Sequence, residues 1–164
     1  MEAQKFGMIL ITTAAIGFAD AAPAETCYDV AGSSSSRNVT ESVQIGRISL
    51  TLSQGGTTAF NATGILVGRI TGAISPIETL LSHTIRFPRG HGFITEGDHA
   101  TIIGPGPYDP SCSVAATETV SNIIVGTRFF KNVSSVDISA DGYISFCPDL
   151  NENRFDLRGE LCIE

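Results

Sequence analysis

The sequence predicts an all-β domain, an eight-stranded antiparallel meander β-barrel. Three observations predict it: strand-like patterns recur along the chain, glycine- or proline-rich breaks separate them, and helical periodicity is absent after the N-terminal segment. The clearest pattern runs from Val136 to Phe146, where even positions are apolar or small and odd positions polar, as in a strand with one buried face. Strands are expected at residues 26–30, 43–52, 57–71, 80–87, 92–103, 113–127, 135–146 and 154–163.

One-sided strands without helices must bury their apolar faces by closing into a barrel or by folding into two sheets. The short breaks favour the barrel, and a β-sandwich is the alternative. Two local features are also expected. The serine run at residues 33–36 is predicted to be a loop, and a shift of apolar phase within residues 43–52 predicts a β-bulge at Gly46 and Arg47.

Residues 1–24 have the pattern of a secretory signal peptide, because Lys5 precedes an apolar run that ends in small-residue cleavage patterns. The run is too short for a membrane-spanning helix, and no later run approaches the length needed. We therefore expect a single domain at residues 25–164 that is secreted or periplasmic and has no membrane span.

The chain is acidic, with a formal net charge of −7 and two lysines. Such a surface repels nucleic-acid backbones and anionic lipid headgroups, so these partners are not expected. The sequence has no Gly-x-Ser-x-Gly elbow and no glycine-rich phosphate loop, which leaves hydrolase and nucleotide-binding functions without support. No cofactor is predicted, and the sequence leaves the oligomeric state open.

Four cysteines in an exported chain predict two disulfides. In a meander, Cys147 and Cys162 end consecutive strands at opposite ends of the barrel, on the order of 25 Å apart at ~3.4 Å per residue. Cys112 begins the strand before the turn at residues 126–134 and Cys147 ends the strand after it, so these two are predicted to bond. Cys27 then pairs with Cys162 across the closing seam. A four-cysteine zinc site is the alternative, but no Cys-x-x-Cys pair supports it.

Several titratable residues are candidates for chemistry. His83 shares a strand face with apolar residues and is expected to point inward, as a ligand contact or as a hydrogen-bonded core histidine. Strand pairing could bring His99 near it, but no third ligand is identified, so no metal site is predicted. Glu96 and Asp98 are expected on one strand face, as an acid–base pair or as a solvated face. Residues 149–160 nearly match a calcium loop, but arginine replaces the required glycine, and a polar hairpin is expected.

The turns at residues 88–92 and 126–132 are expected at the barrel end that carries the seam between Cys27 and Cys162. Together they gather a rim of basic and aromatic side chains: Arg89, His91, Arg128, Phe129, Phe130 and Lys131. In an acidic protein, such a rim is suited to admit an amphiphilic or anionic small molecule. The alternative is that Phe129 and Phe130 plug this end of the barrel as part of the core.

Four segments resemble a known family. They are LLSHTIRF at 80–87, GFIT at 92–95, IVGT at 124–127 followed by Phe130 and a strand of small residues, and LRGELC at 157–162. These are similar to secreted bacterial proteins with the allene oxide cyclase-like barrel, an architecture that dirigent proteins share. The resemblance implies a barrel that holds an apolar molecule and steers its cyclisation or coupling. The chain departs from the family at Arg128 and at Ser134-Ser135, where glycines are usual.

The leading functional hypothesis is a secreted barrel that binds a small apolar or amphiphilic molecule in its lumen, with His83 and the rim residues as contacts. One alternative is a barrel cyclase or isomerase that uses the same cavity to restrict substrate conformations. The other is a cell-envelope interaction module with a filled core. Eight strands enclose either packed side chains or one small ligand, so an open cavity favours the first two.

Overall fold

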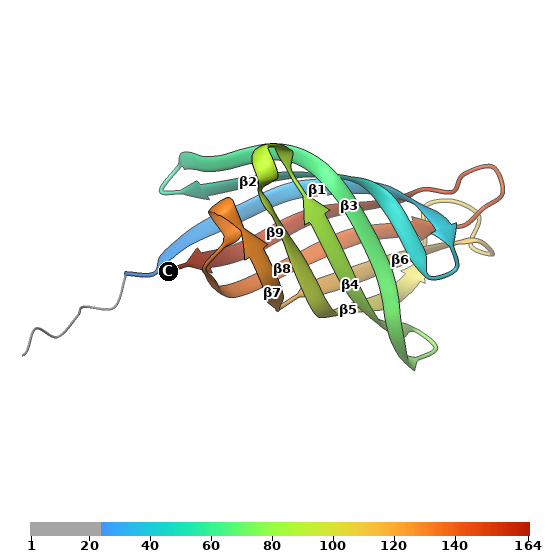
Figure 1. Cartoon of the computed structure of the whole chain (residues 1–164). Coiled ribbons are helices and arrows are strands. Elements are labelled where there is room, and N and C mark those ends of the chain that lie inside the picture. Colours follow the sequence, from blue (N-terminus) through green and yellow to red (C-terminus); the bar gives the residue numbers. More distant parts are fainter. Residues whose placement is uncertain (1–23) are drawn as a thin grey trace, which may run out of the picture.

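Nine strands form the wall of a barrel in the computed structural model, which describes residues 24–164 (Figure 1). They are β1 (Thr26–Thr40), β2 (Val43–Gln54), β3 (Thr57–Ser75), β4 (Glu78–Arg86), β5 (Gly92–Pro105), β6 (Ser113–Val120), β7 (Ile123–Thr127), β8 (Val133–Ser145) and β9 (Asn153–Ile163). Two single-turn 3-10 helices, η1 (Pro88–Gly90) and η2 (Arg128–Phe130), lie between strands. Within residues 24–164, no helix has the length and apolar character needed to cross a membrane. The predicted signal peptide lies outside the described residues, except for Ala24.

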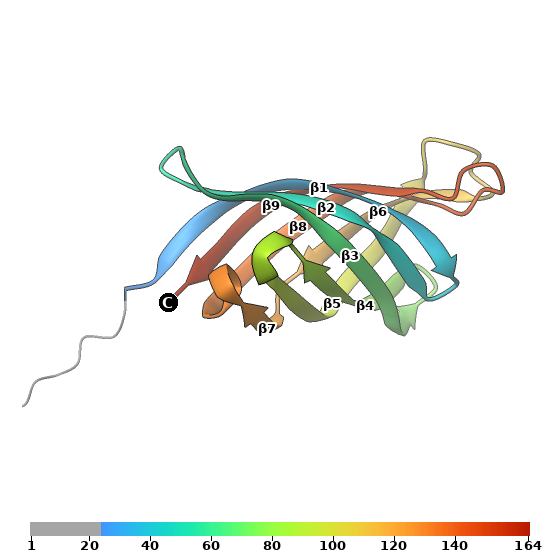
Figure 2. The ribbon, with the colours of Figure 1, turned by 45° about the horizontal axis from the view of Figure 1, so that its top comes forward.

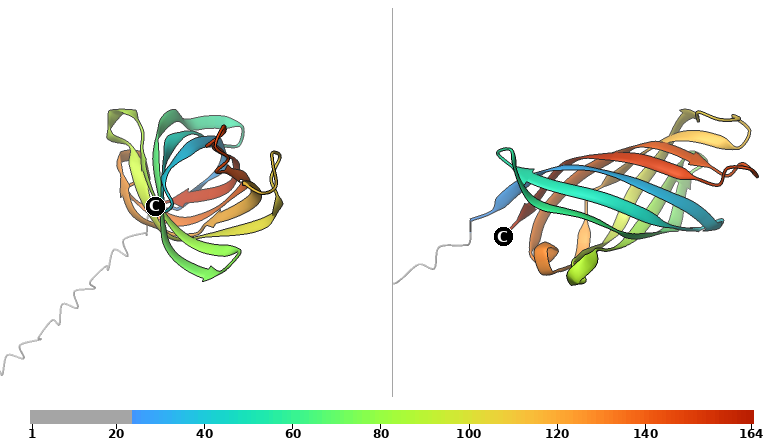
Figure 3. Two further views of the ribbon diagram at one scale, coloured as in Figure 1. Left: turned by 90° about the vertical axis from the view of Figure 1, so that its right-hand side faces the viewer. Right: turned by 90° about the horizontal axis from the view of Figure 1, so that it is seen from above.

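The strands are hydrogen-bonded in the order β4-β3-β2-β1-β9-β8-β6-β5, and pairing of β4 with β5 closes the ring. β7 pairs with the first residues of β5, whereas β6 pairs with the later residues of β5. β6 and β7 therefore share one position, and the nine strands fill eight positions around the barrel. The closed eight-stranded antiparallel meander barrel is therefore confirmed, and the end-on view shows its ring of strands (Figure 3). The prediction of one continuous strand over residues 113–127 is wrong, because Ser121 and Asn122 divide it into β6 and β7.

The apolar faces of the strands line the barrel interior and pack together in a core cluster. In β8 the predicted alternation is confirmed in the middle of the strand, where Ile138 and Ala140 are buried and Asp137 is exposed. It is wrong at the end of the strand, because Ser145 is fully buried and Phe146 is 56 % exposed. Each large apolar side chain that is fully buried contributes about 1.5–3 kcal/mol to folding. The buried core cluster consists of Val30, Ile48, Leu50, Leu52, Phe60, Leu66, Ile85, Phe87, Phe93, Val120, Phe130, Ile138 and Leu161.

Both predicted disulfides are confirmed. Cys27 and Cys162 face each other on β1 and β9 with their Cα atoms 3.9 Å apart, and we call their bond the seam disulfide. Cys112 precedes β6 and Cys147 follows β8, and their Cα atoms are 4.9 Å apart. Two disulfides indicate an oxidising environment outside the cytoplasm.

Two local predictions in the first hairpin are wrong. Residues 33–36 belong to β1 rather than to a loop, because the serines continue its alternation: Ser36 is buried inside the barrel and Ser35 is exposed. The register of β1 on β2 runs without interruption through Gly46 and Arg47, so no bulge lies there. Ile45 faces solvent on the outer side of β2, with 42 % of its surface exposed, so the change of apolar phase in the sequence reflects an outward apolar side chain and not a bulge.

The two ends of the barrel differ. The seam end holds the seam disulfide together with η1 and η2, which lie side by side because Thr127 Oγ1 donates a hydrogen bond to the Gly90 carbonyl at 2.9 Å. The opposite end, which we call the mouth end, holds the Cys112–Cys147 bond and the long loops between β5 and β6 and between β8 and β9, seen at the right of Figure 2.

Candidate functional site

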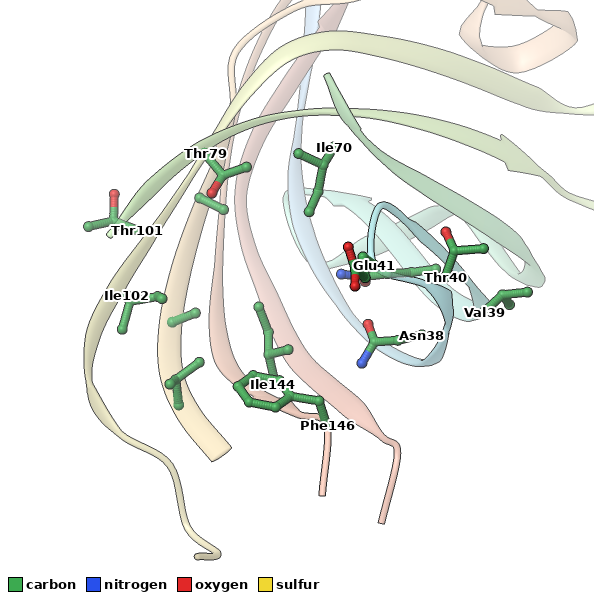
Figure 4. Close-up of a pocket in the computed structure, with 14 residues that line it drawn as sticks. Asn38, Val39, Thr40, Glu41, Ile70, Thr79, Thr101, Ile102, Ile144 and Phe146 are labelled. Carbon is green, nitrogen blue, oxygen red and sulfur yellow. The ribbon is translucent and has the colours of Figure 1, made fainter. Parts of the chain in front are cut away.

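A cavity of about 580 Å³ opens at the mouth end, and we call it the mouth cavity. Its wall is mainly aliphatic, with polar groups concentrated near the turn between β1 and β2 (Figure 4). The lining residues are Asn38, Val39, Thr40, Glu41, Gln44, Ile70, Thr79, Ala100, Thr101, Ile102, Val114, Ala116, Ile144 and Phe146. Small-molecule pockets in proteins typically have about 300–1,000 Å³ and an apolar lining, so the mouth cavity is of suitable size and character.

The polar side of the mouth cavity is held in place by the loop between β8 and β9. The Asn38 backbone N–H donates to Asn151 Oδ1, and Asn151 Nδ2 donates to the Asn38 carbonyl, both at 2.8 Å. Asn153 is fully buried and donates from Nδ2 to Asn38 Oδ1 at 3.0 Å. These bonds fix the end of β1 against the loop. Residues 149–160 do not form one calcium loop, because β9 begins at Asn153.

Three ionisable side chains meet inside the barrel, and we call them the interior cluster. His83 of β4, Asp98 of β5 and Glu118 of β6 are each at most 8 % exposed. His83 Nδ1 lies 2.9 Å from Asp98 Oδ2 and 3.3 Å from Glu118 Oε1. Thr95 Oγ1 donates a hydrogen bond to Asp98 Oδ2 and accepts one from the His83 backbone N–H at 3.0 Å. Three adjacent strands therefore hold the cluster in a defined geometry.

The interior cluster perturbs the pKa of two of its members. Burial alone lowers the pKa of His83, but the nearby charge of Glu118 and the hydrogen bond and charge of Asp98 raise it above its ordinary value. Burial raises the pKa of the Glu118 carboxyl, which the histidine offsets only in part. The site therefore favours a charged imidazole and disfavours two ionised carboxylates in one low-dielectric place.

Asp98 points inward because of a β-bulge at Gly97. Leu81 pairs with Asp98 and Ser82 with Glu96, so Gly97 is the extra residue on β5. Its φ of +76° lies in the left-handed region that glycine adopts readily. The prediction that Glu96 and Asp98 share a strand face is therefore wrong, since Glu96 is exposed and Asp98 is fully buried.

The interior cluster lies directly beneath the mouth cavity. Ala100 and Ala116 line the cavity, and Asp98 and Glu118 are the next inward-facing residues along the same strands. A second cavity, of about 40 Å³, is lined in part by His83 and Glu118. That volume has room for roughly one water molecule or a small ion.

Sequence reasoning located one member of the interior cluster and missed another. His83 points inward as expected, whereas His99 is on the outer face, where its Nδ1 lies 3.2 Å from Glu78 Oε1. Strand pairing therefore does not bring the two histidines together. Glu118 was not predicted. The alternation of β6 places it on the inward face, so an acidic residue in an otherwise apolar row was the signal that could have found it.

The structure brings the six predicted rim residues together at the seam end. His91 is half-buried, and its Nδ1 accepts a hydrogen bond from the Phe129 N–H at 3.3 Å. A pocket of about 360 Å³ lies beside η1 and includes His91 in its lining. The basic side chains are exposed: Arg89, Arg128 and Lys131. Arg128 has a φ of +57°, a conformation that glycine adopts readily.

Aromatic rings fill the barrel at the seam end. Phe130 is fully buried, with its ring centroid 4.8 Å from that of Phe93 and 5.1 Å from that of Phe60. Phe129 is half-buried and packs against Phe60 and Tyr28, with ring centroids 5.2 and 5.6 Å away. We use the name aromatic plug for the six rings of Tyr28, Phe60, Phe87, Phe93, Phe129 and Phe130. The mouth cavity is therefore at the opposite end of the barrel from the predicted rim.

Comparisons of the chain with models of known protein families, with curated proteins and with solved structures found no match. The fold is a small eight-stranded barrel, of a size that encloses either packed side chains or one small ligand. Here the seam end is packed and the mouth end is open, so a function has to be argued from the mouth cavity and the interior cluster.

Proposed function

We propose that the protein binds one small apolar or amphiphilic molecule in the mouth cavity. The observation that carries the proposal is the cavity itself, about 580 Å³ with an aliphatic wall. Transfer of apolar ligand surface from water into such a wall is favourable by about 25 cal/mol per Å². The polar end of an amphiphile would lie near Asn38, Glu41 and Gln44. Because Glu41 is acidic, a neutral or cationic end is favoured over an anionic one.

The proposed place of action is outside the cytoplasm. The two disulfides indicate an oxidising environment, and the signal-peptide pattern of residues 1–24 supports a secreted or periplasmic domain at residues 25–164. The resemblance to allene oxide cyclase-like and dirigent-like barrels implies the same class of ligand, and the barrel architecture is consistent with it. The open cavity supports binding over an interaction module with a filled core.

Binding is tested with N-phenyl-1-naphthylamine, a neutral apolar fluorophore whose emission rises in apolar surroundings. The parent protein is expected to bind one molecule per chain. Ala100→Phe places a ring in the mouth cavity and should weaken binding about tenfold or more, because the ring occupies ligand volume. Ala31→Phe is the matched control, since Ala31 is exposed on the outer face of β1.

The outcome that would overturn the proposal is probe binding of equal affinity in the parent, Ala100→Phe and Ala31→Phe proteins. That result would place the probe on the outer surface. Circular dichroism of all three proteins verifies that the fold is kept. Absence of binding to a folded parent protein would also count against the proposal.

A further inference from the structure

We propose that the interior cluster is a binding site for one divalent transition-metal ion, of the Zn²⁺ class. The possible ligands are His83 Nδ1 and one carboxylate oxygen each of Asp98 and Glu118, and these atoms all lie within 4.8 Å of one another. The bulge at Gly97 turns Asp98 toward His83, and the register of β6 places Glu118 beside them. Neither feature can be seen in the sequence, so no third metal ligand was predicted.

The two separations that involve His83 Nδ1 fit a metal centre. Neighbouring atoms bound at about 2.0–2.2 Å to a tetrahedral or octahedral ion are about 2.8–3.6 Å apart. His83 Nδ1 lies 2.9 Å from Asp98 Oδ2 and 3.3 Å from Glu118 Oε1. An imidazole nitrogen with carboxylate oxygens suits zinc and its first-row neighbours, whereas calcium and magnesium prefer oxygen ligands alone.

The two carboxyl groups of the interior cluster also suit a cation. Two carboxylates are buried beside one imidazole, and buried charges in proteins are normally paired or bound to metal ions. Asp98 is fully buried, and its second oxygen, Oδ1, has no hydrogen-bond partner within residues 24–164. A divalent ion would neutralise both carboxylates and give this carboxylate a further partner.

The ion has room next to its ligands. The cavity of about 40 Å³ is lined by His83 and Glu118, and it is large enough for an ion or its bound water. Three protein ligands with a position open to solvent or ligand are typical of zinc sites that act on a bound molecule. Within residues 24–164, the other close group of potential ligands includes Cys27 and Cys162, whose sulfurs are bonded to each other and are not thiolates.

The test uses purified protein freed of metal with a chelator and titrated with Zn²⁺ alone in a calorimeter near neutral pH. The parent is expected to bind one Zn²⁺ per chain. Asp98→Asn and Glu118→Gln keep the side-chain shape and should each weaken binding about tenfold or more, since even the loss of a residue that supports a metal ligand costs 10–100-fold. The matched control is Glu78→Gln, at the exposed pair with His99, and it should bind as the parent does.

A second measurement does not depend on the variants being folded. Co²⁺ added to the parent protein should give visible d–d absorption bands of a site with nitrogen and oxygen ligands, and Zn²⁺ should remove them. The proposal is overturned if the parent takes up no Zn²⁺ and gives no Co²⁺ bands, or if folded Asp98→Asn and Glu118→Gln proteins bind Zn²⁺ as tightly as the parent. Because no organic ligand is present, failure here leaves the proposal for the mouth cavity standing.

Discussion

Replacing Phe130 with alanine should remove the centre of the aromatic plug. The ring is fully buried, and its centroid lies 4.8 to 5.9 Å from those of Phe93, Phe60, Phe129 and Phe87. Truncation of a buried phenylalanine costs about 3–5 kcal/mol, as lost transfer free energy plus the cavity left behind. Four aromatic neighbours place this site in the upper part of that range. With a denaturant dependence of about 2 kcal/mol per molar urea, the unfolding midpoint should fall by about 2 M.

The control is Phe146→Ala at the mouth end, where the ring is 56 % exposed. Less than half of its surface is buried, so its loss should cost about 1 kcal/mol or less. The assay is equilibrium urea unfolding followed by circular dichroism with both disulfides intact, because the chain has no tryptophan to report by fluorescence. Equal destabilisation by the two variants, or a loss below about 1 kcal/mol for Phe130→Ala, would refute the aromatic plug as a stabilising element.

Three other measurements check separate parts of the fold. A Cβ at Gly126 would lie 1.7 Å from the Phe130 carbonyl oxygen, so Gly126→Ala should lower the free energy of unfolding by more than about 2 kcal/mol in the same urea assay. The control is Gly104→Ala, where no atom lies within 4 Å of the new Cβ and the loss should be under about 1 kcal/mol. The seam disulfide spans a sequence separation of 135 and the Cys112–Cys147 bond one of 35. Replacing the two cysteines of the seam disulfide by serine should therefore cost about 5 kcal/mol of stability, and replacing those of the other bond about 4. The reverse order would contradict the chain-entropy account. Burial, with the hydrogen bond to Tyr108, raises the pKa of Tyr143 to about 12. An ultraviolet titration should therefore show a tyrosine ionisation step near pH 12, and Tyr143→Phe should remove that step.

The parts of the fold that follow from local alternation and chain direction were predictable from sequence. Side chains alternate with a period of two along β8, so the inward row from Val136 to Ile144 could be assigned from hydropathy alone. Strand directions in a meander fix which strand ends meet, and both disulfides followed from them. The serines of residues 33–36 show the limit of this approach, because Ser36 faces inward through a polar contact with Asn153 rather than through hydrophobicity.

The interior cluster could be predicted only in part. His83 is on an apolar strand face, so its inward direction is a local property. Asp98 faces inward because one extra residue, Gly97, reverses the alternation of β5, and hydropathy does not register such a bulge. Bringing Glu118 to within 3.3 Å of His83 requires the register of three strands, which depends on pairing between distant segments.

The seam disulfide also determines where the barrel can open. In a meander barrel the first and last strands meet at one pair, and here β1 and β9 are covalently joined at that pair. β7 is the least secured strand, since it stands at the end of the hydrogen-bonding order and pairs with β5 at four positions. Local unfolding begins where few bonds hold a segment. We therefore expect this barrel to fluctuate most at β7 rather than at the chain termini, and in β7 Ile124 and Val125 are about half exposed.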